Sequence, residues 1–277
     1  MDYHLQDIDY AQNFRQGDII QRDVLKNGQT SYKWGFVLNA DCDIEQSNNS
    51  DRISWMEIIS AKEHIDTHWA QSALKDELAK RASALCENLN AIIKRKEMGL
   101  DLLDGQGLIS WLKEQSASEV ATLVGVEKEA TILQLEALAV AVRATGPCLE
   151  VLLQLGEAFG VQRGNVLEKA RNSLTRSSGF PDTVFVPGLP GFMEQGFVLR
   201  LRDIFSIEQR YVFQSFPDWK VRDEPEGFFR TGRFSDRMRY QVVQKMAFLF
   251  LRIGAPQAYD DHCGHMAGQI FIEKDAN

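Results

Sequence analysis

The sequence predicts an α+β protein in which antiparallel strands near both ends flank a long helical middle. Three observations predict this class: segments rich in β-branched and aromatic residues before residue 60, apolar residues at helical spacing after it, and a return of the β pattern near residue 178. We therefore divide the chain into residues 1–59, 60–177 and 178–277. A length of 277 residues suits two ordinary domains, or one domain with a large insertion.

The first β region contains three predicted strands, over residues 17–20, 32–39 and 52–59. Asn27-Gly28 stands between the first two strands. This pair favours a tight hairpin because both residues tolerate a positive φ. The three strands are expected to form an antiparallel meander, which curls easily into a barrel.

The helical middle is predicted to open at Ser60 and Glu63, whose spacing is that of a capping box. Apolar residues then follow at intervals of three and four, which indicates one long amphipathic helix. Ser116 and Glu119 have the spacing of a second capping box. Further helices are expected over residues 108–114, 128–143 and 147–159. The last two carry few polar residues, so we expect both to be buried.

The final third is predicted to contain three more strands, one helix capped by Ser235 and a terminal strand. Neither β region alone has enough strands for a stable sheet. We therefore expect the two to complete one barrel, with the helical middle as an insertion; three independent pieces are the alternative. The predicted strands span residues 183–187, 196–201, 209–216 and 269–273, and the helix spans 236–252.

Composition argues against membrane and secreted classes. The longest apolar runs, such as residues 138–142 and 151–155, are far shorter than the roughly 20 residues that span a bilayer. The first residues have neither the basic start nor the apolar stretch of a signal peptide. The four cysteines are scattered without a CxxC pair, as in proteins with reduced thiols. We predict a cytoplasmic protein that contacts no membrane and, since it has no glycine-rich phosphate loop, needs no cofactor.

The charge is unevenly distributed. A net charge of −8 opposes tight nonspecific binding of nucleic acid, yet residues 196–252 carry 11 basic and 7 acidic residues. Aromatic and arginine residues alternate there, and such side chains can stack on bases and grip phosphates. The alternative is a set of core aromatics beside an ion-paired surface. The candidate nucleic-acid-binding residues are Phe229, Arg230, Arg233, Arg237 and Arg239.

Residues 17–20 read Gly-Asp-Ile-Ile, and residues 36–44 form a strand that ends in Cys-Asp-Ile. With these motifs the chain resembles a group of uncharacterised bacterial proteins, and residues 248–256 resemble the helix end of that group. The barrel is similar to that of MazF/PemK toxins, which also open with a Gly-Asp-Ile strand. The resemblance covers roughly the first 60 and last 100 residues. It implies a small SH3-like antiparallel β-barrel split by a long all-helical insertion, with a C-terminal helix.

The resemblance also suggests a chemistry. MazF-type toxins cut RNA with an arginine in the loop after the first strand and a threonine or serine in a later strand. Arg22 and Thr30 lie in that part of this sequence, although the Arg-Pro pair of the toxin loop is absent. Genes of this general kind often lie near bacterial defence or stress operons, which is an association and not a mechanism.

Asp41-Cys42-Asp43 is the most unusual local motif. In an extended chain both carboxylates would lie on one side and the thiol on the other. Such a pair could bind a metal or hold a proton. Alternatively, the motif is a strand-end turn in which aspartate caps the backbone and Cys42 fills the core. Two adjacent carboxylates would raise the pKa of Cys42, which disfavours a nucleophilic role.

Two groups of histidines have ligand-like spacing. His64 and His68 lie one helical turn apart, but the glutamate of the zincin motif is missing, so a solvated helix face is the alternative. His262, Cys263 and His265 gather metal-ligand types in one loop, which could bind zinc or simply form a polar turn.

These features favour a non-catalytic binding or regulatory protein of a bacterial stress or phage-defence system, acting through protein–protein contacts. The expected partner is a protein from the same operon or a second copy of the chain. The first alternative is a MazF-like toxin that acts on RNA or DNA through the arginine-rich face. The second is a metal-dependent hydrolase that uses Asp41 and Asp43, or His262 and His265.

Overall fold

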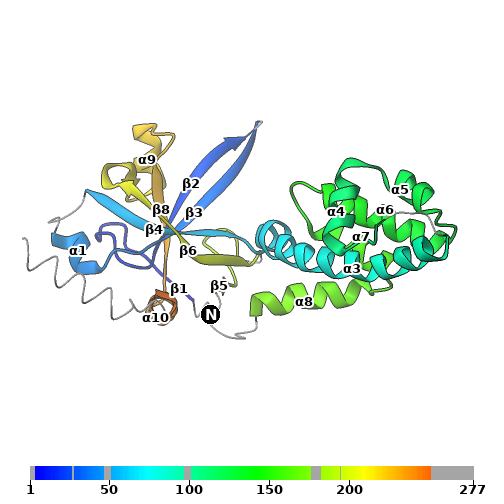
Figure 1. Ribbon diagram of the computed structural model, residues 1–277. Helices are drawn as coiled ribbons and strands as arrows, with labels where there is room; N and C mark the ends of the chain where they lie inside the picture. The colour runs from blue at the N-terminus through cyan, green and yellow to red at the C-terminus, as the bar shows by residue number, and fades with distance from the viewer. Residues whose placement is uncertain are drawn as a thin grey trace, which may run out of the picture.

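The computed structural model describes residues 4–26, 28–46, 51–96, 101–175, 182–193 and 195–250. They form two regions that lie side by side (Figure 1). The sheet region is built from residues before 61 and after 182, and the helical region from residues 61–175. The predicted mixture of helices with an antiparallel sheet is confirmed, and the sheet is curled. The SH3-like identity of this curled sheet stays a prediction.

One sheet takes its strands from both ends of the chain. The strands are β1 (Leu5–Gln6), β2 (Asp18–Lys26), β3 (Gln29–Val37), β4 (Arg52–Ser60), β5 (Thr183–Val186), β6 (Phe197–Glu208), β7 (Val212–Phe213) and β8 (Phe228–Phe234). Their order is β1-β8-β2-β3-β4-β6-β5, and β7 pairs in parallel with β8. The strand β8, from late in the chain, therefore lies between two strands from its beginning.

The hairpin predicted at Asn27-Gly28 is confirmed. Lys26 pairs with Gln29 across β2 and β3, and Gly28 lies in the turn between them. Gly28 has a φ of 76°, a left-handed conformation that glycine adopts without strain. The turn fixes the register of the whole hairpin, in which Ile19 faces Phe36.

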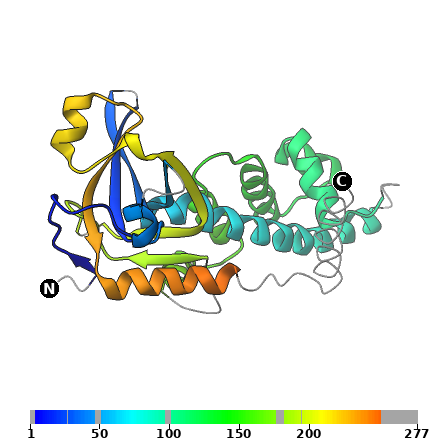
Figure 2. The ribbon, with the colours of Figure 1, turned by 90° about the vertical axis from the view of Figure 1, so that its left-hand side faces the viewer.

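The sheet packs on both of its faces. One face lies against α10 (Asp236–Phe250), which runs along the curled sheet in Figure 2. There Val242 of α10 joins a core that includes Ile19 and Phe36. On the other face, Trp55 packs with Phe14 of the N-terminal loop and with Phe228 of β8. Each face therefore carries a hydrophobic core of its own.

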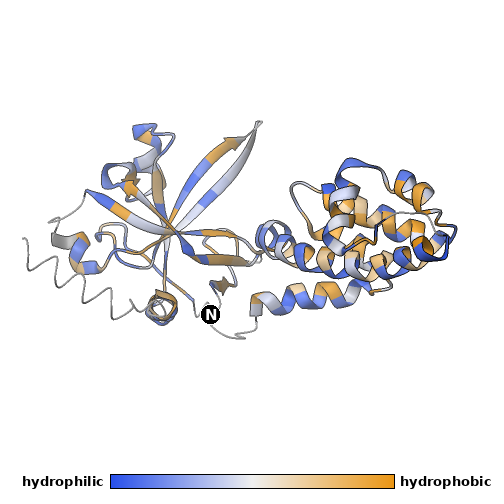
Figure 3. Ribbon diagram, in the orientation of Figure 1, coloured by the Kyte–Doolittle hydropathy of each residue, from blue (hydrophilic) through white to orange (hydrophobic). Residues whose placement is uncertain are grey.

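The helical region begins with one continuous helix that contains a π-helical turn. The helix α2 (Ala61–Glu63) leads into a π-helical turn, His64–Trp69, and then into α3 (Ala70–Arg95). The predicted long helix is thus confirmed. The helices α4 (Gly105–Glu114), α5 (Ala117–Val124), α6 (Glu129–Arg143), α7 (Leu149–Ala158) and α8 (Arg163–Thr175) follow. Figure 3 shows hydrophobic residues turned toward the interior of this region, where Leu85, Leu108 and Leu138 are fully buried.

Both predicted helix starts are present. The Ser60 hydroxyl accepts a hydrogen bond from the Glu63 amide at 3.1 Å. Ser116 accepts from the Glu119 amide, and the Glu119 carboxylate accepts from the Ser116 amide, which completes the second capping box. These bonds satisfy backbone donors that would otherwise lack partners at the helix start.

The two regions are joined where β4 runs into α2 and where α8 precedes β5. The Ala61 amide donates to the Gly196 carbonyl at 2.9 Å, and Ile59 and Val198 pack with Leu174 of α8. The chain leaves the sheet at the end of β4 and returns to it at β5. Both strands pair with β6, so the sheet is continuous although the helical region separates them in the sequence.

The strand predicted over residues 209–216 is wrong. A 3₁₀ turn, η2 (Gln209–Tyr211), and the short β7 precede α9 (Phe216–Arg222). The helix starts there because Ser215 accepts from the Asp218 amide and a proline occupies the first turn.

Among the described residues, the sequence-based prediction also lacked β1, β8, α8 and the short helix α1 (Asp41–Gln46). The predicted strand at 269–273 and the loop with His262, Cys263 and His265 lie outside the described residues. Among the described residues, no helix is long and apolar enough to cross a membrane.

Candidate functional site

A buried cluster of charge links β2 to β8. Asp18 is 0% exposed, Arg230 1% and Arg233 5%. The Asp18 carboxylate accepts from Arg233 Nε at 2.5 Å and from Arg230 Nη1 at 3.4 Å. Two guanidinium groups therefore share one carboxylate in the interior, an arrangement that is stable only when further acceptors surround it.

The N-terminal loop supplies those acceptors. Arg230 donates to the backbone carbonyls of Asp9, Gln12 and Asn13 at 3.0–3.3 Å. Its guanidinium also lies 5.1 Å from the centre of the Phe14 ring. The cluster thus fixes the path of the loop across the sheet.

The predicted arginine-rich face is divided between the interior and the surface. Phe229 is buried beneath Phe216 and Trp219, and Arg230 and Arg233 point into the cluster. Only two of the five residues remain near the surface. Arg239 is held there by Asp41 and Asp236, and Arg237 is exposed. The nucleic-acid hypothesis therefore gains no support from this group.

Asp41-Cys42-Asp43 is helical and not extended, so the expected alternation of side chains is wrong. Asp41 accepts from the Gln16 amide at 2.8 Å and from Arg239 Nη1 at 3.1 Å. Cys42 is exposed and does not fill the core. Asp41 therefore joins the N-terminal loop to α10. Residues two apart on a helix do not face each other, so Asp41 and Asp43 point to different sides of α1.

Arg22 and Thr30, the positions suggested by the toxin resemblance, lie apart. Thr30 pairs with Leu25, three residues along β2 from Arg22, which corresponds to roughly 10 Å. An odd separation also places Arg22 on the opposite face of the hairpin. Arg22 forms an ion pair with Glu226, so the two positions share no site.

His64 and His68 lie at the junction between the regions. Their ring centres are 5.8 Å apart in the π-helical turn. Burial lowers the pKa of His64 to about 4, with further lowering from His68 and Arg200. Burial also lowers the pKa of His68. Within the described ranges, no group of three histidine, cysteine or acidic residues could hold a metal ion. Because burial lowers the pKa of both histidines below the usual 6.5, both imidazoles are neutral at neutral pH.

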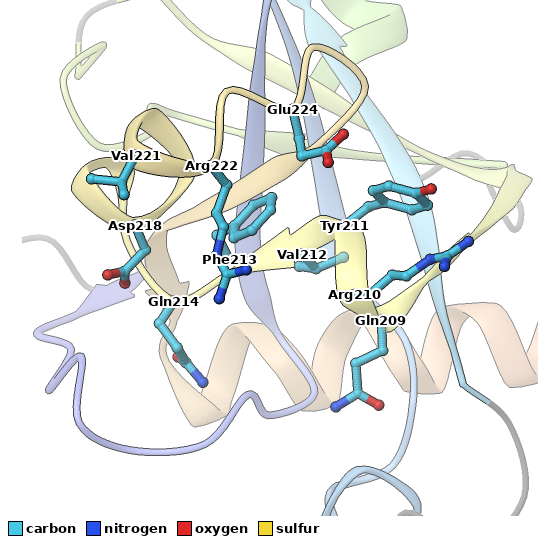
Figure 4. A pocket seen from close by; sticks show the side chains of 10 residues that line it. All are labelled: Gln209, Arg210, Tyr211, Val212, Phe213, Gln214, Asp218, Val221, Arg222 and Glu224. Atoms are coloured by element: carbon cyan, nitrogen blue, oxygen red, sulfur yellow. The ribbon is translucent and has the colours of Figure 1, made fainter.

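Figure 4 shows a pocket between the η2–β7 segment and α9, with a volume of about 800 Å³. In Figure 4, Arg210 and Tyr211 lie on one side and Arg222 and Asp218 on the other. Arg210 is already paired with Glu208 at 2.8 Å. Opposite charges are mixed along the lining, so this pocket favours no class of ligand. The sequence did not reveal it, because residues 209–216 were expected to form a strand.

The outward face of α6 is the largest departure from the expected burial in the helical region. The helices α6 and α7 were both expected to be buried. Leu135 and Leu138 of α6 do lie in the core, but Leu133 is 54% exposed and Val140 55%. These two residues are seven apart, so they lie on the same side of the helix. Glu136, also exposed, lies between them. We call these three residues the α6 stripe.

A shallow groove adjoins the α6 stripe. It is lined by Val140, Ala139 and Ala144 and by Val151 of α7. Its volume is about 590 Å³. Polar side chains, among them Glu136 and Arg143, line the groove as well. The stripe and the groove therefore form one surface in which apolar residues stand beside charged ones.

A comparison of this chain with known protein families, with curated proteins and with solved structures finds no match.

Proposed function

We propose that this chain is a non-catalytic binding protein of a bacterial stress or defence system, and that it acts through protein–protein contacts made by the α6 stripe. The observation that carries the proposal is the exposure of Leu133 and Val140 on a helix whose other side lies in the core. A surface helix normally turns its apolar residues toward the core and its polar residues outward.

The energetics favour a partner on this surface. Fully burying one leucine or valine side chain contributes about 1.5 to 3 kcal/mol. Leu133 and Val140 lie seven residues, or about two helical turns, apart beside a groove. This spacing resembles the anchor positions of a helix that docks on another protein. The neighbouring Glu136 adds a polar edge, as is common at the rim of an interface.

The groups first considered for catalysis are held in structural contacts, which also supports a binding role. Of the catalytic candidates, Asp41 is paired with Arg239 and Arg22 with Glu226. The candidate nucleic-acid-binding residues Arg230 and Arg233 are bound to Asp18. Burial raises the pKa of Cys86 to about 11, so its thiol is protonated and unreactive at neutral pH.

The test is a pair of charge-introducing substitutions in the α6 stripe. We expect Leu133→Glu with Val140→Glu to abolish co-purification of the products of neighbouring genes, or to convert a self-associated chain to a monomer, as measured by light scattering. The control is Leu167→Glu, which changes an exposed leucine on α8, outside the stripe. It should leave the association unchanged.

Circular dichroism of both variants shows whether the helices persist. A chain that is monomeric and never co-purifies with a neighbouring gene product would contradict the proposal. So would a folded stripe variant that keeps its partner.

A further inference from the structure

The helical region contains a second cavity, which shares Ala144 and Thr145 with the groove described above but includes no residue of the α6 stripe. It lies between α3, α4, α6 and the segment that leads to α7, and its volume is about 630 Å³. This is within the size range of small-molecule sites, which often form between the helices of a bundle.

The floor of the cavity is apolar. Leu74 and Ala141 are buried members of the helical core, and Leu78, Ile109 and Val142 are partly buried against that core. No charged side chain contributes to this floor. A ligand that fills it must therefore present an apolar body of similar size.

The rim of the cavity has the opposite character. Lys75 of α3 and Lys113 of α4 both line it, and both are exposed. In the described part of the chain, neither ammonium group lies within ion-pair distance of a carboxylate. Elsewhere in the same region, Lys96 pairs with Glu127. Both ammonium groups are therefore available to an anion at this opening.

The rim also offers hydrogen-bond donors. Gln71 and Gln106 line the opening beside the lysines. Lysine stems can lie along apolar surface while their ammonium groups stay in water. An anionic head group at this position would meet two positive charges and neutral amide donors, while the rest of the ligand lay on the floor.

We propose that this cavity binds a fatty-acid-like ligand, a single apolar chain with a carboxylate head between Lys75 and Lys113. The two lysines of the rim favour a negatively charged head group, and the apolar floor favours a hydrocarbon chain. This site is separate from the α6 stripe, and the test below measures direct binding, so it does not depend on the proposed function.

The experiment uses dodecanoate as the probe, at concentrations below micelle formation, with calorimetry on the full chain. Dodecan-1-ol and dodecyltrimethylammonium serve as neutral and cationic probes of the same chain length. We expect one dodecanoate per chain, bound at least about tenfold more tightly than either comparison probe, since tenfold corresponds to 1.4 kcal/mol. Added salt should weaken dodecanoate binding.

Two sets of variants separate the rim from the floor. Lys75→Met with Lys113→Met should weaken dodecanoate binding about tenfold or more and leave the alcohol unaffected. The matched control, Lys80→Met with Lys128→Met, removes two exposed lysines of the same region that do not line the cavity. Ala79→Trp places a large ring at an exposed lining position and should prevent binding of all three probes.

The proposal is overturned if dodecanoate does not bind. It is also overturned if dodecanoate and dodecanol bind equally, or if the lysine pair and its control behave alike. Should Ala79→Trp fail to fold, the lysine pair and the three probes still decide the question.

Discussion

The sheet region and the helical region place their charges differently. Among the described residues, the buried charged side chains are Asp18, Arg230 and Arg233, and all three belong to the sheet region. The core of the helical region is made of apolar side chains, most of them aliphatic, with Thr131 as its buried polar residue among those described. One region is fixed by directional bonds and the other by shape and apolar contact.

This difference follows from the distances that each region must bridge along the chain. The sheet joins segments that are more than 200 residues apart, and a directional cluster of charge permits few wrong pairings between them. The helical region packs helices that follow one another closely, so local apolar periodicity is enough to assemble it. The contrast suggests that single substitutions should fail in different ways in the two regions.

The largest expected effect is that of Asp18→Asn. This change leaves two buried guanidinium groups without a carboxylate, which should cost about 3 to 5 kcal/mol of unfolding free energy. Urea unfolding measured by tryptophan fluorescence gives that value. The N-terminal loop should also become more sensitive to trypsin, because its carbonyl groups are held by Arg230.

Asp7→Asn is the matched control, since Asp7 is exposed and outside the cluster. It should change the unfolding free energy by less than about 0.5 kcal/mol. A loss of less than about 1 kcal/mol for Asp18→Asn would mean that the cluster does not hold the sheet as described.

In the helical region, Leu138→Ala should destabilise by about 3 kcal/mol. Leu138 is fully buried, and its removal leaves a cavity in a core of aliphatic residues. The double variant with Asp18→Asn sharpens the comparison, because independent sites add to within about 0.5 kcal/mol. A marked departure from additivity in urea unfolding would show that the two regions stabilise each other.

The smallest effect is expected at the junction, where burial lowers the pKa of His64 to about 4 from its usual 6.5. Between pH 4 and pH 6.5, His64 therefore binds a proton in the unfolded chain but not in the folded chain. Stability should therefore fall as the pH decreases from 6.5 toward 4. In His64→Gln the melting temperature should fall less over this interval. Equal slopes in the two proteins, or an NMR titration of His64 near pH 6.5, would contradict the assignment.

Much of the fold could be predicted because the relevant signals are local. Asn27-Gly28 fixed a hairpin, and Ser60 and Ser116 marked helix starts, because each acts on its own neighbours. The strand β8 was missed for the opposite reason. Its residues read Phe-Phe-Arg-Thr-Gly-Arg-Phe, and buried arginines remove the apolar alternation that marks a strand.

The sites were harder to predict because they depend on tertiary pairing. The Gly-Asp-Ile motif stood out, yet nothing near Asp18 in the sequence shows that its partners lie beyond residue 229. The α6 stripe was hidden because Leu133 and Val140 have the same chemistry as the buried Leu135 and Leu138. The lysines at the cavity rim, on α3 and α4, meet only after those helices pack.

The position of β8 between β1 and β2 has a consequence for synthesis. Asp18 leaves the ribosome 212 residues before Arg230. At about 5 to 20 residues per second, the wait is about 10 to 40 s. The helical region is complete within that interval and is free to fold, while β2 still lacks a neighbour on one edge. During translation the nascent chain would carry an open strand edge that is vulnerable to aggregation or chaperone capture, and truncation before β8 would make that state permanent.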